Sequence, residues 1–137
     1  MSTASTPDPF ADAMPFAGAC GVEFVEADRD EVVARMSWRP ERCTVDGVLH
    51  GAALMTLADS AGAVCAFLNL PPGAGTSTLT SSTSFFAAVR SGAVRAVSRP
   101  LHVGRTTIAV RTELFDDDAR LVAHVTQTQA VLAPPRQ

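Results

Sequence analysis

The stretch "LHGAALMTLADSAG", residues 49–62, decides the fold of this chain. It consists mainly of small and apolar residues that favour helix, and "PPG" follows at residues 71–73, so a helix is predicted from about residue 50 to residue 69. The predicted helix carries one charged side chain, Asp59, and other elements must therefore cover most of its circumference. An acid nine residues after His50 in such a helix needs a chemical explanation.

Segments with strand patterns lie on both sides of this helix. Residues 31–39 alternate cleanly and place Val32, Ala34 and Met36 on one face. The other predicted strands are residues 22–27, 76–89, 92–103, 106–115 and 121–132, and one short helix is predicted within residues 10–21. The order ββαββββ predicts an α+β fold in which a curved antiparallel sheet wraps around one long central helix.

The length and composition are those of one globular domain. We expect residues 1–15 to be a flexible amino-terminal segment and residues 16–137 to form a single domain with one core. The net charge is -3, and no basic stripe for nucleic acid is present. All 11 basic residues are arginine, which excludes a Schiff-base lysine and a P-loop lysine and leaves arginine as the permanent cation for binding phosphate.

Cysteine and histidine spacings give no sign of a metal or a disulfide framework. The 3 cysteines contain no C-x-x-C pair, and the 3 histidines lie far apart in the sequence. We therefore expect no metal and no cofactor. Because no signal peptide is visible and no apolar run is long enough to span a bilayer, the expectation is a soluble, cytoplasmic protein with neither a membrane nor a nucleic-acid partner.

His50, Gly51 and Asp59 form the most informative group. Gly51 lies in the first helical turn, where backbone N–H groups lack partners and can stabilise a developing oxyanion. Asp59 points roughly away from Gly51, so two subunits related by a dyad could use both groups on one carbonyl where one subunit could not. The simpler interpretation is a thin exposed stripe of Thr56, Asp59 and Ser60 with a histidine cap. The pattern alone leaves both interpretations open.

Three segments resemble the hotdog-fold acyl-CoA thioesterases, in the branch typified by the phenylacetate-pathway thioesterase. They are "LHGAALMTLADSAGA", "GTSTLTSSTSFFAAVRSG" and "HVGRTTIAVRTELFDDDARLVAHVTQT". The family signature is a glycine, two residues, His-Gly-Gly, and an acid nine residues after the histidine, which correspond here to Gly47, His50, Gly51 and Asp59. The resemblance covers about residues 40–132. It implies a hotdog fold that hydrolyses an acyl-CoA thioester to a free carboxylic acid and CoA.

The resemblance also implies catalytic roles. The amide of Gly51 would polarise the thioester carbonyl, and Asp59 of the neighbouring subunit would act as nucleophile or general base. His50 would orient the loop or the carbonyl. Ala52 replaces the second glycine of His-Gly-Gly.

Further site residues follow from the same resemblance. Thr44 stands where many relatives carry Asn or Gln. Thr78 best fits the hydroxyl that some relatives place on the strand after the helix, and Ser77 is the neighbouring possibility. The expected substrate-binding residues are Ser60, Ala63, Ser77, Arg90 and Arg105. The two arginines lie at turns where the family meets the CoA phosphates, although a solvated turn arginine is the simpler interpretation of each.

The expected assembly is a homodimer joined through the polar strand near residues 76–86, with dimers pairing into homotetramers. A non-catalytic acyl-CoA-binding or scaffold protein of the same fold is the alternative function. A thiol pair of Cys43 and His50 is a weaker alternative, and Cys65 fits a small core residue. The acyl group is not specified by the sequence, although small helix residues with Phe85 and Phe86 leave room for an aromatic or medium-chain group.

Overall fold

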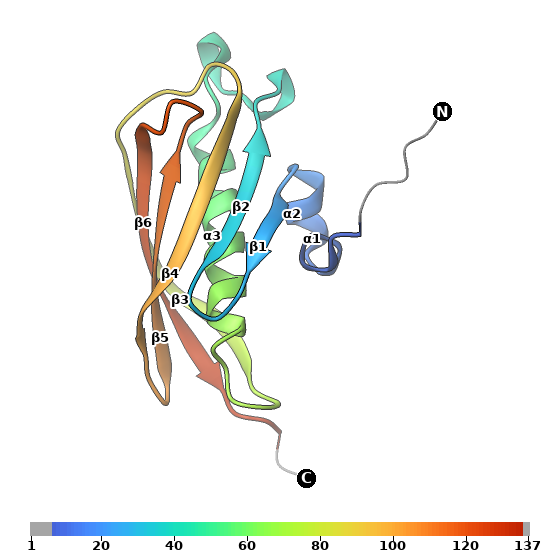
Figure 1. The fold of residues 1–137 in the computed structure, drawn as a ribbon, viewed down its shortest axis with the longest axis vertical. Coiled ribbons are helices and arrows are strands. Elements are labelled where there is room, and N and C mark those ends of the chain that lie inside the picture. The colour runs from blue at the N-terminus through green and yellow to red at the C-terminus, as the bar shows by residue number, and fades with distance from the viewer. Residues whose placement is uncertain (1–6, 136–137) are drawn as a thin grey trace.

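The computed structural model describes residues 7–135, which form a sheet curved along one side of a long helix (Figure 1). The helix is α3, Gly51–Phe67. The strands are β1 (Glu23–Ala27), β2 (Val32–Ser37), β3 (Gly75–Phe85), β4 (Ala93–Val103), β5 (Thr107–Phe115) and β6 (Leu121–Leu132). They form one antiparallel sheet in the order β1-β2-β4-β5-β6-β3, which confirms the predicted hotdog architecture.

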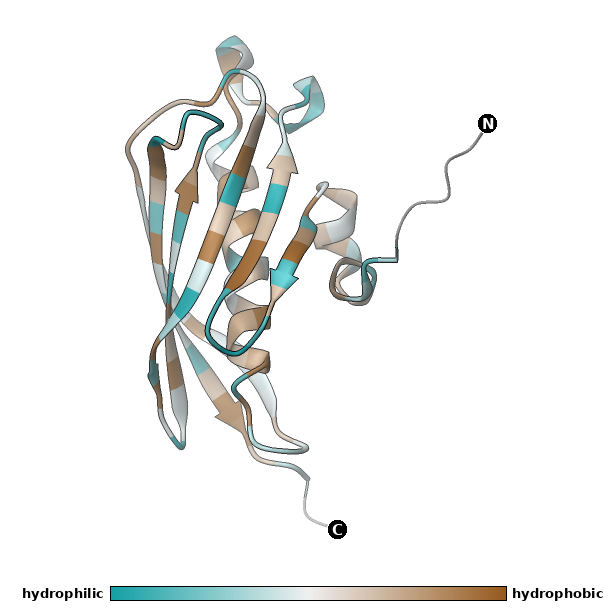
Figure 2. Ribbon diagram, viewed as in Figure 1, coloured by the Kyte–Doolittle hydropathy of each residue, from teal (hydrophilic) through white to brown (hydrophobic). Residues whose placement is uncertain are grey.

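The core lies between α3 and the inner face of the sheet. Val32, Ala34 and Met36 are fully buried, as the alternation in β2 predicts, and β5 buries its alternate residues in the same way. Leu57 and Ala61 of α3 are also fully buried, and Figure 2 shows this helix coloured mainly as apolar. Burial of these side chains holds α3 against the sheet.

One face of α3 is left uncovered by the other residues that the structure describes. Its exposed residues are Ala52, Met55, Asp59 and Phe67, and the half-buried Ala63 lies between them. Their spacing of three or four residues places them on one side of the helix. Asp59 is therefore on an exposed, mostly apolar face of an otherwise buried helix.

The amino-terminal region contains two short helices, α1 (Pro9–Ala13) and α2 (Pro15–Ala19), where the sequence predicts one. The break occurs at Met14, whose φ of -117° and ψ of 83° are not helical. The physical reason is Pro15, because a proline disfavours helical geometry in the residue before it.

Asp8 links the amino-terminal helices to β1 of the sheet by hydrogen bonds. Its carboxylate accepts hydrogen bonds from the N–H of Ala11 in α1 at 3.1 Å and from the N–H of Phe24 in β1 at 2.9 Å. The ring of Phe10 lies 5.3 Å from that of Phe24. The predicted boundary between the amino-terminal segment and the domain, at residues 15 and 16, falls at the start of α2. Residues 1–6 of the predicted segment lie outside the described residues.

The start of α3 is fixed by two neighbouring loops. Where the sequence predicts a plain loop, two 3-10 turns occur, η1 (Pro40–Arg42) and η2 (Val45–Gly47). The N–H of His50 donates to the carbonyl of Arg42 at 2.9 Å, and the N–H of Leu49 donates to the carbonyl of Val89 at 2.9 Å. These bonds hold the first turn of α3 beside the connection between β3 and β4.

β3 is an edge strand. It pairs with β6 along one side, and in the described residues no strand pairs with its other side. All of its side chains except those of Thr76 and Thr83 are exposed. No helix within residues 7–135 has the length and apolar character needed to cross a membrane.

Candidate active site

His50 caps the amino end of α3. Its Nδ1 accepts the N–H of Ala52 at 3.1 Å. An imidazole nitrogen that accepts a hydrogen bond carries no proton, so the neutral ring holds its proton on Nε2. His50 is exposed, which leaves this Nε2–H available to an acceptor outside the chain. The capping role that the sequence allows for His50 is therefore confirmed. The Nε2–H remains free to donate a hydrogen bond to a substrate.

Gly51 is the first residue of α3, and its backbone N–H has no acceptor among the described residues. This N–H lies at the positive end of the helix dipole, so it suits an oxygen that gains negative charge. A Cβ at this position would come within 3.3 Å of Cζ of Phe85, the last residue of β3. The absence of a side chain therefore keeps the space around this amide open.

The carboxylate of Asp59 is held by two donors from the sheet. Nε2 of Gln127 in β6 donates to Oδ1 at 3.3 Å, and Oγ1 of Thr78 in β3 donates to the same oxygen at 3.5 Å. The structure thus brings Thr78 of β3 to Asp59. Asp59 itself is exposed, so its carboxylate can meet a substrate.

Gln127 and Gln129 belong to this site, and the sequence reasoning did not identify them. Both side chains are almost fully buried, and Nε2 of Gln129 donates to Oγ1 of Thr78 at 2.7 Å. The signal was present in β6, where the inward-facing positions 123, 125, 127 and 129 change from apolar residues to glutamines. A buried polar side chain at such a position needs a partner, and here that partner is the site around Asp59.

Gly51 and Asp59 of the same chain are too far apart to act on one carbonyl. Eight residues separate them along α3, which corresponds to about 12 Å of helix rise. A thioester carbonyl that accepts a hydrogen bond from one amide must lie within about 3 Å of it. One chain alone therefore cannot bring both groups to the same carbonyl.

Three predicted site residues lie away from the Asp59 carboxylate. Thr44 is exposed in the loop before α3, where its N–H donates to the carbonyl of Val48 at 2.8 Å. Ser60 is buried, and its hydroxyl donates to the carbonyl of Thr56 at 2.7 Å, so it forms no exposed stripe with Asp59. Ser77 is exposed on β3. The structure does not gather these three residues into one cluster.

Ala63 lies one helical turn beyond Asp59 and lines an apolar cavity of about 240 Å³. The cavity lies between α1, α3 and the start of β3, and its other lining residues are Phe10, Ala13, Met14, Val64, Phe67 and Thr76. Because residues i and i+4 share a helix face, this cavity is on the side of α3 that carries Asp59.

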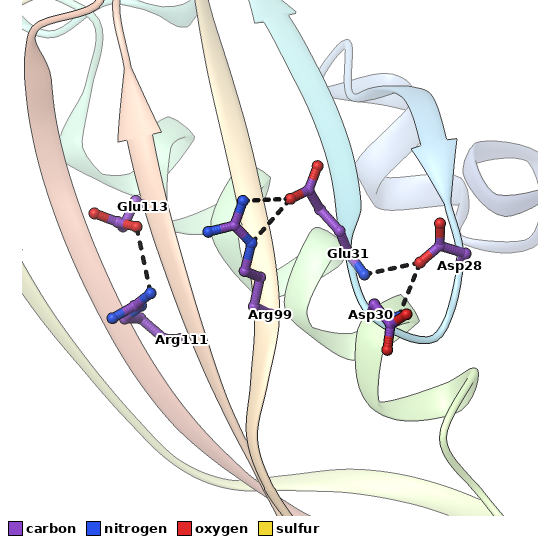
Figure 3. Close-up of polar contacts among 6 residues, drawn as sticks. All are labelled: Asp28, Asp30, Glu31, Arg99, Arg111 and Glu113. Carbon is purple, nitrogen blue, oxygen red and sulfur yellow. Dashed lines mark hydrogen bonds and ion pairs between the residues drawn. The ribbon is translucent and has the colours of Figure 1, made fainter.

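Most arginines on the sheet have acidic partners. Figure 3 shows Arg99 of β4 beside Glu31, to which its Nε donates at 2.9 Å, and Arg111 of β5 within 3.8 Å of Glu113. Arg90 and Arg105 make no ion pair with other described residues. These two arginines therefore keep a free charge that could meet an anion.

Arg90 and Arg105 cannot contact the same phosphate group in one chain. They flank β4, which is 11 residues long and spans about 35 Å at about 3.3 Å per residue. Figure 1 shows the turn between β4 and β5 at the end opposite the start of α3. Arg105 thus lies at one end of the molecule, and Arg90 lies at the other.

The surroundings of Arg90 are acidic. It lines a shallow surface cavity with Asp116, Asp117 and Asp118, and with Arg120. The backbone N–H of Arg120 bonds the carboxylate of Asp116 and holds the pKa of that group below its ordinary value. Asp116 is therefore ionised at neutral pH, and its charge weakens the attraction of this cavity for phosphate.

The cysteines give no support for thiol chemistry. The Sγ of Cys43 donates to the carbonyl of Arg39 at 3.3 Å, while Nδ1 of His50 is occupied by the N–H of Ala52. Cys65 is a buried core residue, as predicted, and burial raises the pKa of its thiol to about 11. Within residues 7–135, no three His, Cys, Asp or Glu side chains are arranged to bind a metal ion.

Residues 46–123 match the family described as the thioesterase superfamily. The chain is 34% identical over 86 residues to the 1,4-dihydroxy-2-naphthoyl-CoA hydrolase of Escherichia coli, and the match covers 63% of each protein. It is 30% identical over 100 residues to the proofreading thioesterase EntH of Cronobacter turicensis, and the match covers 73% of each protein.

A mutant of the phenylacetic acid degradation protein PaaI from Thermus thermophilus has a similar structure. The two structures superpose with a TM-score of 0.79 at 28% sequence identity, and the match covers 86% of this chain and 99% of that chain.

Proposed function

This chain belongs to the thioesterase superfamily, and we propose that it hydrolyses an acyl-CoA thioester to a free carboxylic acid and CoA. The resemblance noted in the sequence is thereby confirmed. The observation that carries the proposal is the exposed carboxylate of Asp59 held by Gln127 and Thr78 on a largely apolar helix face. The E. coli relative is named as a CoA-thioester hydrolase, which supports CoA as the leaving group.

The proposed reaction uses one half-site from each of two subunits. The Gly51 N–H of one subunit donates to the thioester carbonyl, and the Asp59 carboxylate of the other lies at the carbonyl carbon. The tetrahedral intermediate carries a negative oxygen, which the amide and the helix dipole stabilise. The Nε2–H of His50 is a further donor toward the same carbonyl or its loop.

Two routes are open to Asp59. As a nucleophile it attacks the carbonyl carbon, releases CoA as the thiolate, and leaves a mixed anhydride that water hydrolyses. As a general base it takes a proton from water while the hydroxide attacks, and the CoA thiolate leaves from the tetrahedral intermediate. Both routes give one carboxylic acid and one CoA per water consumed.

The edge strand β3 and the exposed face of α3 support a proposed dimer. One backbone edge of β3 pairs with no other strand of the described residues, and such an edge readily adds another strand. Leu79 and Phe86 on and after this strand are more than half exposed, and so is Phe67 on α3. Pairing of β3 with its counterpart extends the sheet across two chains, and we propose that two such dimers form a homotetramer.

The substrate would occupy the Asp59 side of α3. The apolar cavity beside Ala63 fits an aromatic or medium-chain acyl group, because its lining is nearly free of polar groups. Arg105 is the better of the two arginines for the CoA phosphates, since acidic side chains surround Arg90. Ser77 and Thr44 are further contacts of the bound substrate in this proposal.

A panel of acyl-CoAs tests the proposed function. Purified protein is incubated with short-chain, medium-chain and aromatic acyl-CoAs, and CoA release is followed with a thiol-detecting reagent against a protein-only blank. We expect release well above the buffer rate for at least one member, and the Asp59→Asn variant serves as the matched control. Binding without release by the wild-type protein would favour the alternative, a non-catalytic acyl-CoA-binding or scaffold protein.

A further inference from the structure

We infer that Gln127 is a positioning residue that fixes the Asp59 carboxylate for attack, and that Gly62 is the residue that makes room for it. This inference rests on the proposed function of Asp59. The side chain of Gln127 is only 2% exposed, and its Nε2 lies 3.3 Å from Oδ1 of Asp59. It reaches the helix from β6, 68 residues further along the chain.

Oε1 of Gln127 argues against a purely stabilising role for this side chain. It is buried and has no hydrogen-bond partner among the described residues. A buried carbonyl without a partner destabilises the folded state, and an apolar side chain of the same shape would avoid that cost. The amide is nevertheless oriented with its N–H₂ toward Asp59, because the opposite orientation would place an oxygen against the carboxylate.

Gly62 forms the space that this orientation requires. A Cβ at position 62 would collide with Oε1 of Gln127 and lie 2.6 Å from its Cδ. Gly62 is in the interior of α3, where glycine lowers helix stability relative to alanine. Two destabilising features, the glycine in the helix and the unpartnered carbonyl in the sheet, thus occur together with the hydrogen bond from Gln127 to Asp59.

A second donor reaches the same carboxylate oxygen through Gln129. Its Nε2 donates to Oγ1 of Thr78 at 2.7 Å, so the hydroxyl hydrogen of Thr78 remains free to point at Oδ1 of Asp59. Oγ1 of Thr76 lies 3.2 Å from Oε1 of Gln129 and 2.9 Å from the carbonyl oxygen of Ala130, so its single hydrogen is shared between these two acceptors. Gln129 therefore acts on Asp59 through Thr78.

The two donors leave one carboxylate oxygen for the reaction. Both hydrogen bonds that the described residues make to Asp59 end on Oδ1. Oδ2 accepts none from them, and Asp59 is exposed. A carboxylate anchored at one oxygen presents the other in a fixed direction, which lowers the orientational cost of attack.

Gln127→Met tests the inference because methionine is nearly the same length and has no N–H donor. We expect kcat to fall at least about tenfold with KM nearly unchanged, which is the loss expected for a misplaced reacting group. We expect the melting temperature to stay the same or to rise, because the unpartnered carbonyl is gone. A merely structural role predicts the reverse, a lower melting temperature with kcat preserved.

Gly62→Ala and Thr128→Val provide matched variants. Gly62→Ala keeps Gln127 but displaces its amide, so kcat should fall as it does in Gln127→Met. Thr128 lies between the two glutamines on the opposite face of β6, and Thr128→Val should keep wild-type kcat. Equal losses in Gln127→Met and Thr128→Val, or none in Gln127→Met, would overturn the inference.

Nuclear magnetic resonance separates this inference from the proposed function. The side-chain amide protons of Gln127 are assigned by their loss in Gln127→Met and compared between wild type and Asp59→Asn. We expect them to move when the carboxylate is removed, whether or not the protein hydrolyses a thioester. Unmoved resonances overturn the positioning role even if the enzyme is active. An inactive wild type with moved resonances overturns the proposed function and leaves the contact between Gln127 and Asp59 standing.

Discussion

Gly51 lies directly against the ring of Phe85, so the first residue of α3 is covered by the last residue of β3. A Cβ at position 51 would come within 3.3 Å of Cζ of that ring. The ring is about half exposed and can shift by a few tenths of an ångström. A methyl group at position 51 would therefore reduce the space near the free amide without unfolding the chain.

Gly51→Ala is expected to lower kcat about tenfold or more, because the methyl group restricts the approach of the thioester carbonyl to the backbone donor. The measurement is steady-state hydrolysis of the best acyl-CoA, together with a melting curve. Gly75→Ala is the control, since a Cβ there meets nothing closer than 3.9 Å. If Gly51→Ala melts far below wild type, the effect belongs to packing against Phe85 instead.

Asp59→Asn is expected to lower kcat at least about a hundredfold, the scale for losing a general base or nucleophile. Asparagine keeps the shape and can still accept from Gln127 and Thr78, so the fold and CoA affinity should persist. Single-turnover hydrolysis and CoA binding are measured on the same preparation. Asp59→Glu should retain part of the activity, because it restores the charge on a longer side chain. A kcat of Asp59→Asn near the wild-type value would contradict a catalytic role for Asp59.

The sequence was sufficient for the sheet and the central helix because their signals are local. The alternation in β5 indicates a strand with one buried face, and the near absence of charge in α3 indicates a helix that is covered over most of its surface. The break between α1 and α2 was also local, since Pro15 disfavours helix in Met14, but the small apolar residues around it masked the proline.

The network around Asp59 could not be predicted from spacing alone. Gln127 and Asp59 meet only because β6 packs beside α3, and 68 residues separate them in the sequence. Ser60 is a different case, in which a polar residue makes a local contact and takes no part in the site. A serine in a helix can donate its hydroxyl hydrogen to the carbonyl four residues earlier. The sequence pattern places Ser60 in the polar stripe because spacing carries no information about that hydrogen bond.

Ser98→Ala is expected to lower the free energy of unfolding by about 1–3 kcal/mol, because it leaves the hydroxyl of Thr112 unpartnered in the core. The two hydroxyl oxygens lie 2.6 Å apart between β4 and β5, and both residues are fully buried. The double variant Ser98→Ala/Thr112→Val should lose less than the sum of the two single variants. Chemical denaturation measures all four proteins, and strict additivity would contradict the coupling.

The thiol of Cys65 is expected to be unreactive in the native protein at pH 8. Burial raises its pKa to about 11, so the thiol is protonated there, while Cys20 and Cys43 are half-buried and accessible. The unfolded thiol ionises near the ordinary value of 9.0, so stability should fall as pH rises from about 9 toward 11. Thiol titration with and without denaturant checks the first point. Cys65→Ala should flatten the alkaline loss.

Mixing the weakened variants Gly51→Ala and Asp59→Asn is expected to restore activity if the site is shared between subunits. Gly51 and Asp59 of one chain are about 12 Å apart along α3, so each proposed site takes its amide from one chain and its acid from the other. In a mixed dimer of Gly51→Ala and Asp59→Asn, one site contains both substitutions and the other contains none. Random exchange of subunits should therefore recover about a quarter of wild-type activity, because half of the dimers are mixed and each has one intact site. The variants are unfolded and refolded together, with each variant refolded alone as the control, and light scattering confirms the oligomer. A monomer in light scattering, or a mixture no more active than its components, would contradict the shared site.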